Sequence, residues 1–212
     1  MTDLVPGLDW EAVLEGAPSG FDVTPADRAA LDASAGAGAA TYGEVLPHAA
    51  RRLLRWLALG PDDVFADLGS GSGRLVFQAA CETRVRKAVG VELSVDRHRA
   101  AEEGLRRLVA ACPAEAGAGL ASRIQLLCED VRATDVRALT VVYVAATSFP
   151  APLWSDTCRR LAEEAPGLRR LVATRPLPAP WDRHFPLVGE LELDMTWTRN
   201  ARVHVHRTPA RR

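Results

Sequence analysis

The segment Val64–Arg74 constrains the fold more than any other part of this 212-residue chain. It begins with an apolar run, Val64–Leu68, that contains one acid, Asp67, and is followed by three glycines at alternate positions: Gly69, Gly71 and Gly73. The run predicts a buried parallel strand, and the glycines predict a tight turn whose backbone amides approach a ligand closely. The apolar residues after Arg74 keep helical spacing. A strand, a tight turn and a helix N-terminus in succession predict a site for a carboxylate or a phosphate.

The spacing of the glycines separates two classes of nucleotide site. The dinucleotide fingerprint is G-x-G-x-x-G. Here the third glycine comes one position early, and Arg74 stands where that glycine is expected. This difference disfavours a nicotinamide-dependent oxidoreductase, as does the lack of a second domain for a substrate. A tight turn that binds no ligand is the other alternative.

Strands and helices alternate along the rest of the chain. Further strands are expected at Ala88–Leu93, Arg123–Cys128, Leu139–Val144 and Leu168–Ala173, and the runs Pro186–Thr198 and Ala201–Arg207 predict an antiparallel hairpin. Helices are expected at 47–59, from 74, at 94–111 and at 152–165, while 113–121 is a loop or a short helix. The prediction is an α/β, Rossmann-like fold with a seven-stranded, mostly parallel sheet, helices on both faces and a C-terminal antiparallel hairpin.

Two of these helices carry predictions about burial. In the helix at 47–59, Leu53, Leu54, Trp56 and Leu57 are available for burial. In the helix at 94–111, four arginines are expected on a solvated face because two glutamates interrupt them: Arg97, Arg99, Arg106 and Arg107.

The domain division is expected near residue 40. Residues 1–40 predict a helical lead-in or a lid, with short helices at 8–14 and 25–31, and residues 41–212 form the main domain. The small residues of 33–40, with Gly36 and Gly38, are typical of a linker or a mobile lid. A solvated leader is the alternative.

Composition limits the partners and the compartment. The net charge is −1, and no apolar stretch is long enough to span a bilayer, so nothing global attracts the chain to nucleic acid or to a membrane, and a cytoplasmic location is expected by default. The four cysteines form no C-x-x-C pair, and no histidines have metal-ligand spacing, so we expect reduced thiols in or near the core and neither a zinc site nor a disulfide. The oligomeric state is open.

Acidic residues follow two of the expected strands. Glu92 ends the second strand, where a nucleotide ribose needs a carboxylate for its two hydroxyls. Asp130 and Val131 follow the third strand, where a carboxylate can accept from the amine of adenine and an apolar side chain can pack on its ring. Ser148 and Phe149 follow the fourth strand, at the mouth where chemistry is expected.

These motifs together resemble a known family. The run Asp67-Leu68-Gly69-Ser70-Gly71-Ser72-Gly73 resembles motif I of class I S-adenosylmethionine (SAM)-dependent methyltransferases. With Tyr42-Gly43-Glu44 before it, and Gly90-Val91-Glu92 and Glu129-Asp130 after it, the segment 41–150 resembles the disruptor-of-telomeric-silencing family of non-SET histone lysine methyltransferases. The resemblance implies SAM as cofactor and methyl transfer to a protein lysine.

The resemblance also implies which residues bind the cofactor. Three lie over its methionine moiety: Thr41, Tyr42 and Glu44. Asp67, Gly69 and Gly71 bind that moiety from below, Glu92 holds the ribose, and Asp130 with Val131 holds the adenine. The other implied cofactor-binding residues are Ser70, Gly73, Leu93 and Ala145.

The chain departs from the family at three places. The family has paired asparagines and a phenylalanine after the fourth strand, where this chain has Ala145, Ala146 and Thr147, with Phe149 close by. The family's glutamine after the glycine turn is replaced by Arg74. The only arginines at the chain's end are Arg207, Arg211 and Arg212, in place of a long basic tail.

The chemistry of methyl transfer adds candidate catalytic residues. The nucleophile must lie in line with the bond that breaks, and a lysine amine must be neutral, which an apolar channel favours. The candidate catalytic residues are Tyr42, Ser148 and Phe149, and Trp154 and Trp197 are candidates for the channel wall. Two alternatives stay open: a small-molecule N- or O-methyltransferase in which His48, Glu44 or Ser148 orients the acceptor, and a non-catalytic SAM-binding module.

Overall fold

The computed structural model describes residues 8–208. Its strands are β1 (Val64–Leu68), β2 (Lys87–Glu92), β3 (Ile124–Cys128), β4 (Val141–Val144), β5 (Arg170–Ala173), β6 (Leu187–Leu193) and β7 (Ala201–Arg207). Its helices are α1 (Trp10–Val13), α2 (Pro25–Ala35), α3 (Pro47–Leu57), α4 (Arg74–Glu82), α5 (Val95–Ala110), α6 (Ala114–Arg123), α7 (Ala151–Glu164) and α8 (Trp181–His184), with a 3₁₀ turn, η1 (Ala146–Ser148). The segment left open as a loop or a short helix is therefore α6.

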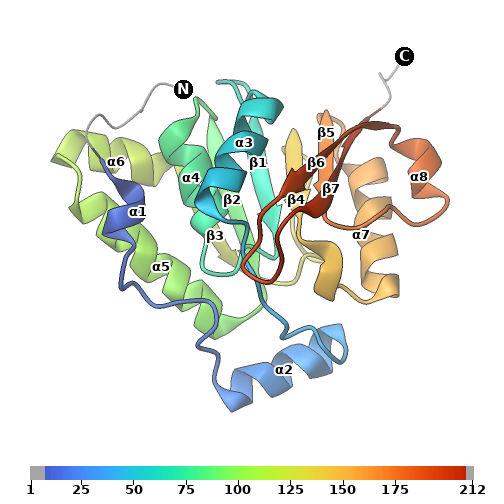
Figure 1. The fold of residues 1–212 in the computed structure, drawn as a ribbon, viewed down its shortest axis with the longest axis horizontal. Helices are drawn as coiled ribbons and strands as arrows, with labels where there is room; N and C mark the ends of the chain where they lie inside the picture. The colour runs from blue at the N-terminus through green and yellow to red at the C-terminus, as the bar shows by residue number, and fades with distance from the viewer. Residues whose placement is uncertain (1–7, 209–212) are drawn as a thin grey trace.

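The strands form one seven-stranded sheet in the order β3-β2-β1-β4-β5-β7-β6 (Figure 1). The first five strands are parallel, and β7 is antiparallel to both β5 and β6. The predicted fold class is confirmed, including the C-terminal antiparallel pair. The chain reverses its strand order between β1 and β4, and ligands of open α/β sheets bind at such a switch point.

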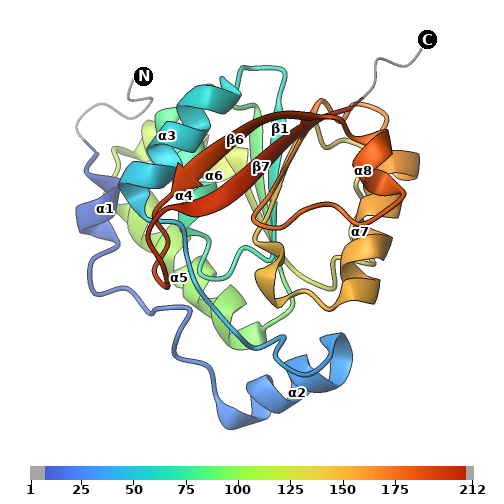
Figure 2. The same ribbon diagram turned by 45° about the vertical axis from the view of Figure 1, so that its right-hand side comes forward.

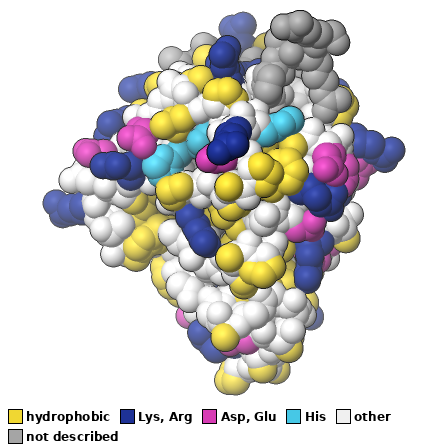
Figure 3. Space-filling model, turned by 90° about the vertical axis from the view of Figure 1, so that its right-hand side faces the viewer, with side chains coloured by type: hydrophobic (Ala, Val, Ile, Leu, Met, Phe, Trp, Pro, Cys, Tyr) yellow, Lys and Arg dark blue, Asp and Glu magenta, His cyan; other side chains and the backbone are white. Residues whose placement is uncertain are grey.

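Alternate residues of β1 point to opposite layers. Phe65 packs in a cluster with α1, α3 and α4, whereas Val64, Ala66 and Leu68 pack with α7 and α8. Such two-sided burial is the reason that the strand is an almost continuous apolar run. The described part of the surface over α7 and α8 mixes basic, acidic and apolar side chains (Figure 3).

Several hydrogen bonds attach the N-terminal segment to the domain. The indole of Trp10 in α1 donates to Glu82 Oε1 at 3.0 Å, and Trp10 is buried. Helix α2 lies at the opposite end of the molecule, below the sheet in both ribbon views (Figures 1 and 2). There Thr24 caps the helix and also donates to Asp96. The helices predicted at 8–14 and 25–31 are both present.

Two predictions about burial are wrong. Trp56 is 39% exposed, and its ring lies beside Gly189 of β6, the edge strand of the sheet. Arg97 is only 5% exposed, although the charge pattern predicted a solvated position. The charge of Arg97 is stabilised because its guanidinium donates to the carbonyls of Gly20 and Ala40.

The first strand of the hairpin is shorter than predicted and ends at Leu193. Beyond it the chain turns toward the segment before α3. Met195 forms an isolated antiparallel bridge with Val45, and the amide of Thr196 donates to the carbonyl of Glu44 at 2.8 Å. The C-terminal hairpin therefore holds the tyrosine-glycine-glutamate segment against the sheet.

The cysteines form no disulfide within the described part of the chain, and they lie in different environments: Cys81 and Cys158 are buried, Cys112 is half-buried and Cys128 is exposed. Among residues 8–208, no group of three potential ligands is placed to hold a metal ion. No helix in that range has both the length and the apolar character that a bilayer crossing requires.

Candidate functional site

A cavity of about 610 Å³ opens at the carboxyl ends of the central strands, the position expected for a ligand in such a sheet. The strand-end segments and α2 both contribute to its wall. Ten of the predicted site residues line it: Thr41, Tyr42, Gly69, Glu92, Leu93, Asp130, Val131, Ala145, Ser148 and Phe149. The volume lies in the range of sites for small molecules and cofactors.

A second, much smaller cavity of about 30 Å³ adjoins the first and shares four lining residues with it: Tyr42, Gly43, Gly69 and Ala145. Three further predicted residues line this space: Glu44, Asp67 and Ser70. Gly71 and Gly73 line neither cavity. At Gly71 a Cβ would lie 2.2 Å from the ring of Tyr42, so this glycine makes room for the tyrosine.

The amides of the glycine turn are occupied within the protein. Those of Gly69 and Ser70 donate to the carbonyl of Val91 at 2.8 and 2.9 Å. The amide of Gly71 donates to Glu92 Oε2 at 2.8 Å, and that of Ser72 to the Tyr42 hydroxyl at 3.1 Å. The expectation that these amides are available to a ligand is therefore wrong, because the turn uses them to bind the end of β2 and the tyrosine.

Asp67 is a buried acid whose pKa is strongly raised. Its side chain is 5% exposed, and its Oδ1 accepts no hydrogen bond from any residue in the described range. Burial, and then the nearby carboxylates of Glu92 and Glu44, raise the pKa of Asp67 to about 8. A buried carboxyl oxygen without a donor is a strong site for a cationic or donor group of a ligand.

Glu92 is also buried, at 6% exposure, but its oxygens have donors. Oε1 accepts from the amide of Ser94 and Oε2 from the amide of Gly71, each at 2.8 Å. Burial raises the pKa of Glu92, and these amides and the Arg97 charge oppose that rise. Because each carboxylate oxygen has a second lone pair, Glu92 can still accept from a ligand that enters the main cavity.

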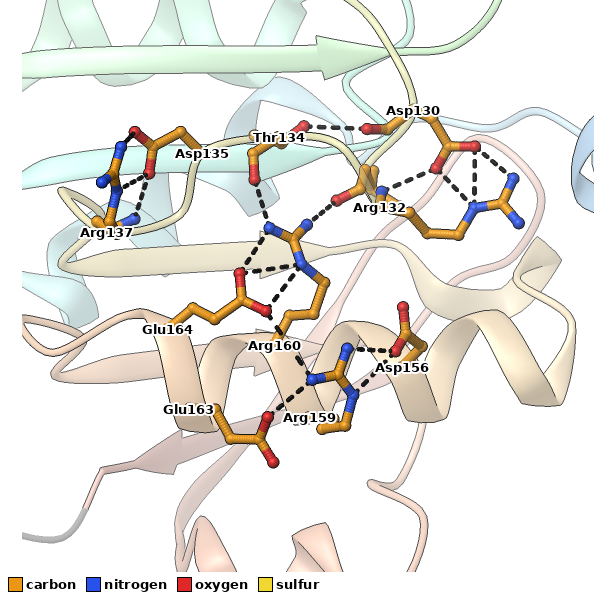
Figure 4. A network of polar contacts seen from close by, with 11 residues as sticks. Asp130, Arg132, Thr134, Asp135, Arg137, Asp156, Arg159, Arg160, Glu163 and Glu164 are labelled. Carbon is orange, nitrogen blue, oxygen red and sulfur yellow. Dashed lines mark hydrogen bonds and ion pairs between the residues drawn. The ribbon is translucent and has the colours of Figure 1, made fainter.

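Asp130 lies in a loop that α7 holds in place. Arg160 of α7 donates to the carbonyls of Val131 and Thr134 at 2.7 and 2.8 Å (Figure 4). The carboxylate of Asp130 is paired with the guanidinium of Arg132, whose hydrogen bonds hold the pKa of Asp130 below its usual range. Asp130 therefore stays an acceptor at neutral pH.

Tyr42 connects the N-terminal segment to the glycine turn. Its hydroxyl donates to Glu44 and lies 3.2 Å from Ser72 Oγ, and the guanidinium of Arg97 lies 4.5 Å from the centre of its ring. Burial, and then the charge of Glu44, raise the pKa of Tyr42 well above its ordinary value. The hydroxyl stays protonated and serves as a fixed donor.

The wall beyond β4 is mostly apolar. Phe149 and Ser148 line the main cavity there, and Trp197 closes it from the C-terminal hairpin. Trp154 does not line it: the ring is 1% exposed in the core, and its indole donates to the carbonyl of Pro176, so its assignment to a channel wall is wrong. His48 lines neither cavity and pairs with Asp194 at 3.0 Å.

The sequence reasoning missed several residues of the cavity wall. Arg97 was predicted to face solvent, yet it lines the cavity. It lies on the same face of α5 as the buried residues Ala100, Ala101, Gly104 and Leu108, which follow it at helical spacing. That spacing was the available signal. Leu31 and Ala35 of α2 also line the cavity, and no local pattern indicated where α2 would lie.

Comparison with known proteins places the chain in a family. The family model described as histone methylation protein DOT1 matches residues 23–180, well over half of the chain. The chain belongs to this family. The DOT1 family comprises SAM-dependent methyltransferases, so the resemblance inferred from the motifs is confirmed.

Curated relatives match short stretches of the chain. A histone-lysine N-methyltransferase, H3 lysine-79 specific, of Caenorhabditis elegans is 48% identical over 54 residues, which are 26% of this chain and 6% of that protein. A protein-lysine N-methyltransferase of Saccharolobus islandicus is 45% identical over 51 residues, which are 24% of this chain and 32% of that protein. The matches therefore span less than a third of each relative.

Solved structures share the fold. The m1A22 tRNA methyltransferase TrmK of B. subtilis superposes with a TM-score of 0.59 at 16% identity, over 77% of this chain and 67% of that one. An RNA methyltransferase from Salinibacter ruber in complex with S-adenosyl-L-homocysteine gives 0.53 at 22% identity, over 77% of this chain and 92% of that one. At such identities the likeness establishes the methyltransferase fold and no acceptor.

The cofactor of the DOT1 family, SAM, fits the charges of the two cavities. SAM carries an α-ammonium group, and Asp67 Oδ1 is a buried acceptor that lacks a donor among the described residues. SAM also carries a ribose and an adenine, and Glu92 and Asp130 are carboxylates on the wall of the larger cavity. The donor and acceptor pattern of the pockets therefore matches the groups of this cofactor.

Proposed function

We propose that the protein transfers a methyl group from SAM to the side-chain amine of a protein lysine. The observation that carries the proposal is the wall from Ala145 to Pro150 with Leu153, which lines the cavity and contains no titratable side chain. A hydroxyl acceptor needs a base to remove its proton, whereas a neutral amine brings its own lone pair. Membership of a family with protein-lysine methyltransferases supports the same acceptor.

The cofactor-binding residues of this proposal are those named from the sequence. Glu92 accepts from the ribose, Asp130 with Val131 holds the adenine, and Asp67 binds the ammonium group. Leu93, Ala145, Thr41 and the residues of the glycine turn complete the pocket, and SAM supplies an electrophilic methyl group when it is bound. The turn acts chiefly through its shape, since its amides are engaged with Val91, Glu92 and Tyr42.

The residues at the mouth orient the acceptor. Phe149 and Trp197 present aromatic surface to the cavity, and Trp197 is 44% exposed, so it is accessible to an incoming chain. Low polarity there lowers the pKa of a lysine amine and so favours its neutral, nucleophilic form. Ser148 is the polar group nearest in sequence to Phe149 and can hold the amine by a hydrogen bond. Tyr42 acts through position, as its hydroxyl is engaged with Glu44 and Ser72.

We also propose that the end of the N-terminal segment, within the 1–40 region, is the lid of this site. Leu31, Ala35 and the residues at 37–39 line the main cavity. The lid is tethered on both sides: Asp27 accepts from the Ser94 hydroxyl, and Arg132 donates to the carbonyl of Ser34 at 3.1 Å. Since Arg132 also pairs with Asp130, closure of α2 is coupled to the proposed adenine site.

The test is the transfer of labelled methyl from SAM into a cell extract, which is then separated into protein, nucleic-acid and small-molecule fractions. Label in protein that is recovered as methyl-lysine after hydrolysis is the expected result, and Glu92→Gln is expected to remove it. Label in nucleic acid or in small molecules alone would overturn the lysine acceptor. SAM binding without any labelled product would make the protein a SAM-binding module.

A further inference from the structure

The small cavity has an acidic side chain on one wall and a basic side chain on another. Asp67 forms one wall, with its unpartnered oxygen Oδ1. Arg74 and Leu75, the first two residues of α4, form another wall. Among the described residues that line this space, Arg74 is the one cationic side chain. The volume of about 30 Å³ leaves room for about two water molecules.

The guanidinium of Arg74 has spare hydrogen-bonding capacity. Its Nε lies 3.4 Å from Glu44 Oε2, and its terminal nitrogen lies 3.5 Å from the carbonyl of Leu14, both long contacts. Glu44 has closer partners, since it accepts from Ser72 Oγ at 2.6 Å and from the Tyr42 hydroxyl. Of the five N–H donors of Arg74, several are therefore available to an anion.

The surroundings of the cavity would otherwise repel an anion. Asp67, Glu92 and Glu44 lie close enough that the latter two raise the pKa of Asp67. A ligand that brings a carboxylate into this space needs a cation to offset the charges of Glu92 and Glu44. The N-terminus of α4 adds to that offset, because its cap, Gly73, has no side chain to accept from the first amides of the helix.

We propose that Arg74, together with the N-terminus of α4, binds the α-carboxylate of SAM while Asp67 binds its α-ammonium group. The small cavity thereby selects the zwitterionic amino-acid end of the cofactor. This inference rests on the proposed function and concerns a position where the chain departs from its family, which has a glutamine. Arginine supplies a full charge and a two-pronged donor set where glutamine supplies a neutral amide.

The test compares two ligands that differ in one group. S-adenosyl-L-homocysteine and its α-carboxamide are titrated calorimetrically into the wild-type protein, Arg74→Gln and Arg74→Lys. The wild type is expected to bind the carboxylate form about tenfold or more tightly than the carboxamide. Arg74→Gln is expected to lose that preference by weakening only the carboxylate form, and Arg74→Lys to keep part of it.

A matched control removes the same charge elsewhere. Arg84→Gln changes an exposed arginine that lines neither cavity, and it should leave the affinity for both ligands unchanged. If Arg74→Gln weakens both ligands equally, or leaves the preference intact, the assignment of Arg74 is overturned. If the wild type binds neither ligand, the proposed function fails instead, so the two failures are distinguishable.

Discussion

Asp67 is expected to destabilise the cofactor-free protein, so that Asp67→Asn makes it more stable. The pKa of this buried carboxyl is raised from an ordinary value of 3.8 to about 8. Between these values the unfolded chain is ionised while the folded protein keeps the proton. The free energy of unfolding is therefore not reduced by Asp67 below pH 3.8, where both states are protonated. It falls as the pH rises from 3.8 toward 8, because the unfolded chain then releases the proton that the folded protein keeps.

The magnitude follows from the size of the shift. Each pH unit in that window costs the folded state about 1.4 kcal/mol, and the sum reaches about 4 kcal/mol at neutral pH. The amide of an asparagine needs partners of its own, and a buried unmet partner costs about 1–3 kcal/mol. The net gain in the free energy of unfolding for Asp67→Asn at neutral pH is then roughly 1–3 kcal/mol.

Urea unfolding at several pH values checks this expectation. The difference in unfolding free energy between Asp67→Asn and the wild type should grow by about 3 kcal/mol from about pH 5 to about pH 7. Asp62→Asn makes the same chemical change at an exposed position of the preceding loop and serves as the matched control. A pH-independent difference for Asp67→Asn would refute the reasoning.

Three further changes test contacts at the site and in the sheet. Gly71→Ala places a Cβ 2.2 Å from the ring of Tyr42 at a φ of +55°. We therefore expect a lower melting temperature and a loss of about 2–4 kcal/mol in the free energy of unfolding. The control Gly119→Ala, on the exposed side of α6 with nothing within 4 Å, should be neutral or stabilising. Arg97→Gln removes a buried guanidinium from two backbone carbonyls and should cost about 2–4 kcal/mol and speed proteolysis between residues 20 and 44. Burial lowers the pKa of His206 from 6.5, so the contribution of His206 to unfolding stability should fall as the pH drops below that value. The unfolding free energy of His206→Gln relative to the wild type should therefore rise as the pH falls below 6.5, and a difference that does not vary with pH would contradict this expectation.

The sequence by itself predicted the sheet and the general position of the site. Val64–Leu68 and the glycine turn were identified correctly because a buried parallel strand must be apolar on both faces and a turn with positive φ requires glycine. Glu92 and Asp130 were placed at the cavity because the ends of adjacent parallel strands meet at one edge of the sheet. The positions of this strand, the turn and the two acidic residues follow from the local sequence pattern and from the fold class.

The tertiary structure decided what each group of the site is bonded to. The amides of the glycine turn donate hydrogen bonds to Val91, Glu92 and Tyr42. Because these acceptors are distant in sequence from the turn, no local pattern predicted these hydrogen bonds. Arg97 is buried because the segment around Gly20 and Ala40 brings carbonyls to its guanidinium. The raised pKa of Asp67 likewise depends on burial and on carboxylates from other segments. Burial, hydrogen-bond partners and neighbouring charges are properties of the assembled fold. They depend on contacts between segments that are far apart in the sequence, and the local sequence of one segment does not indicate which other segment it will contact.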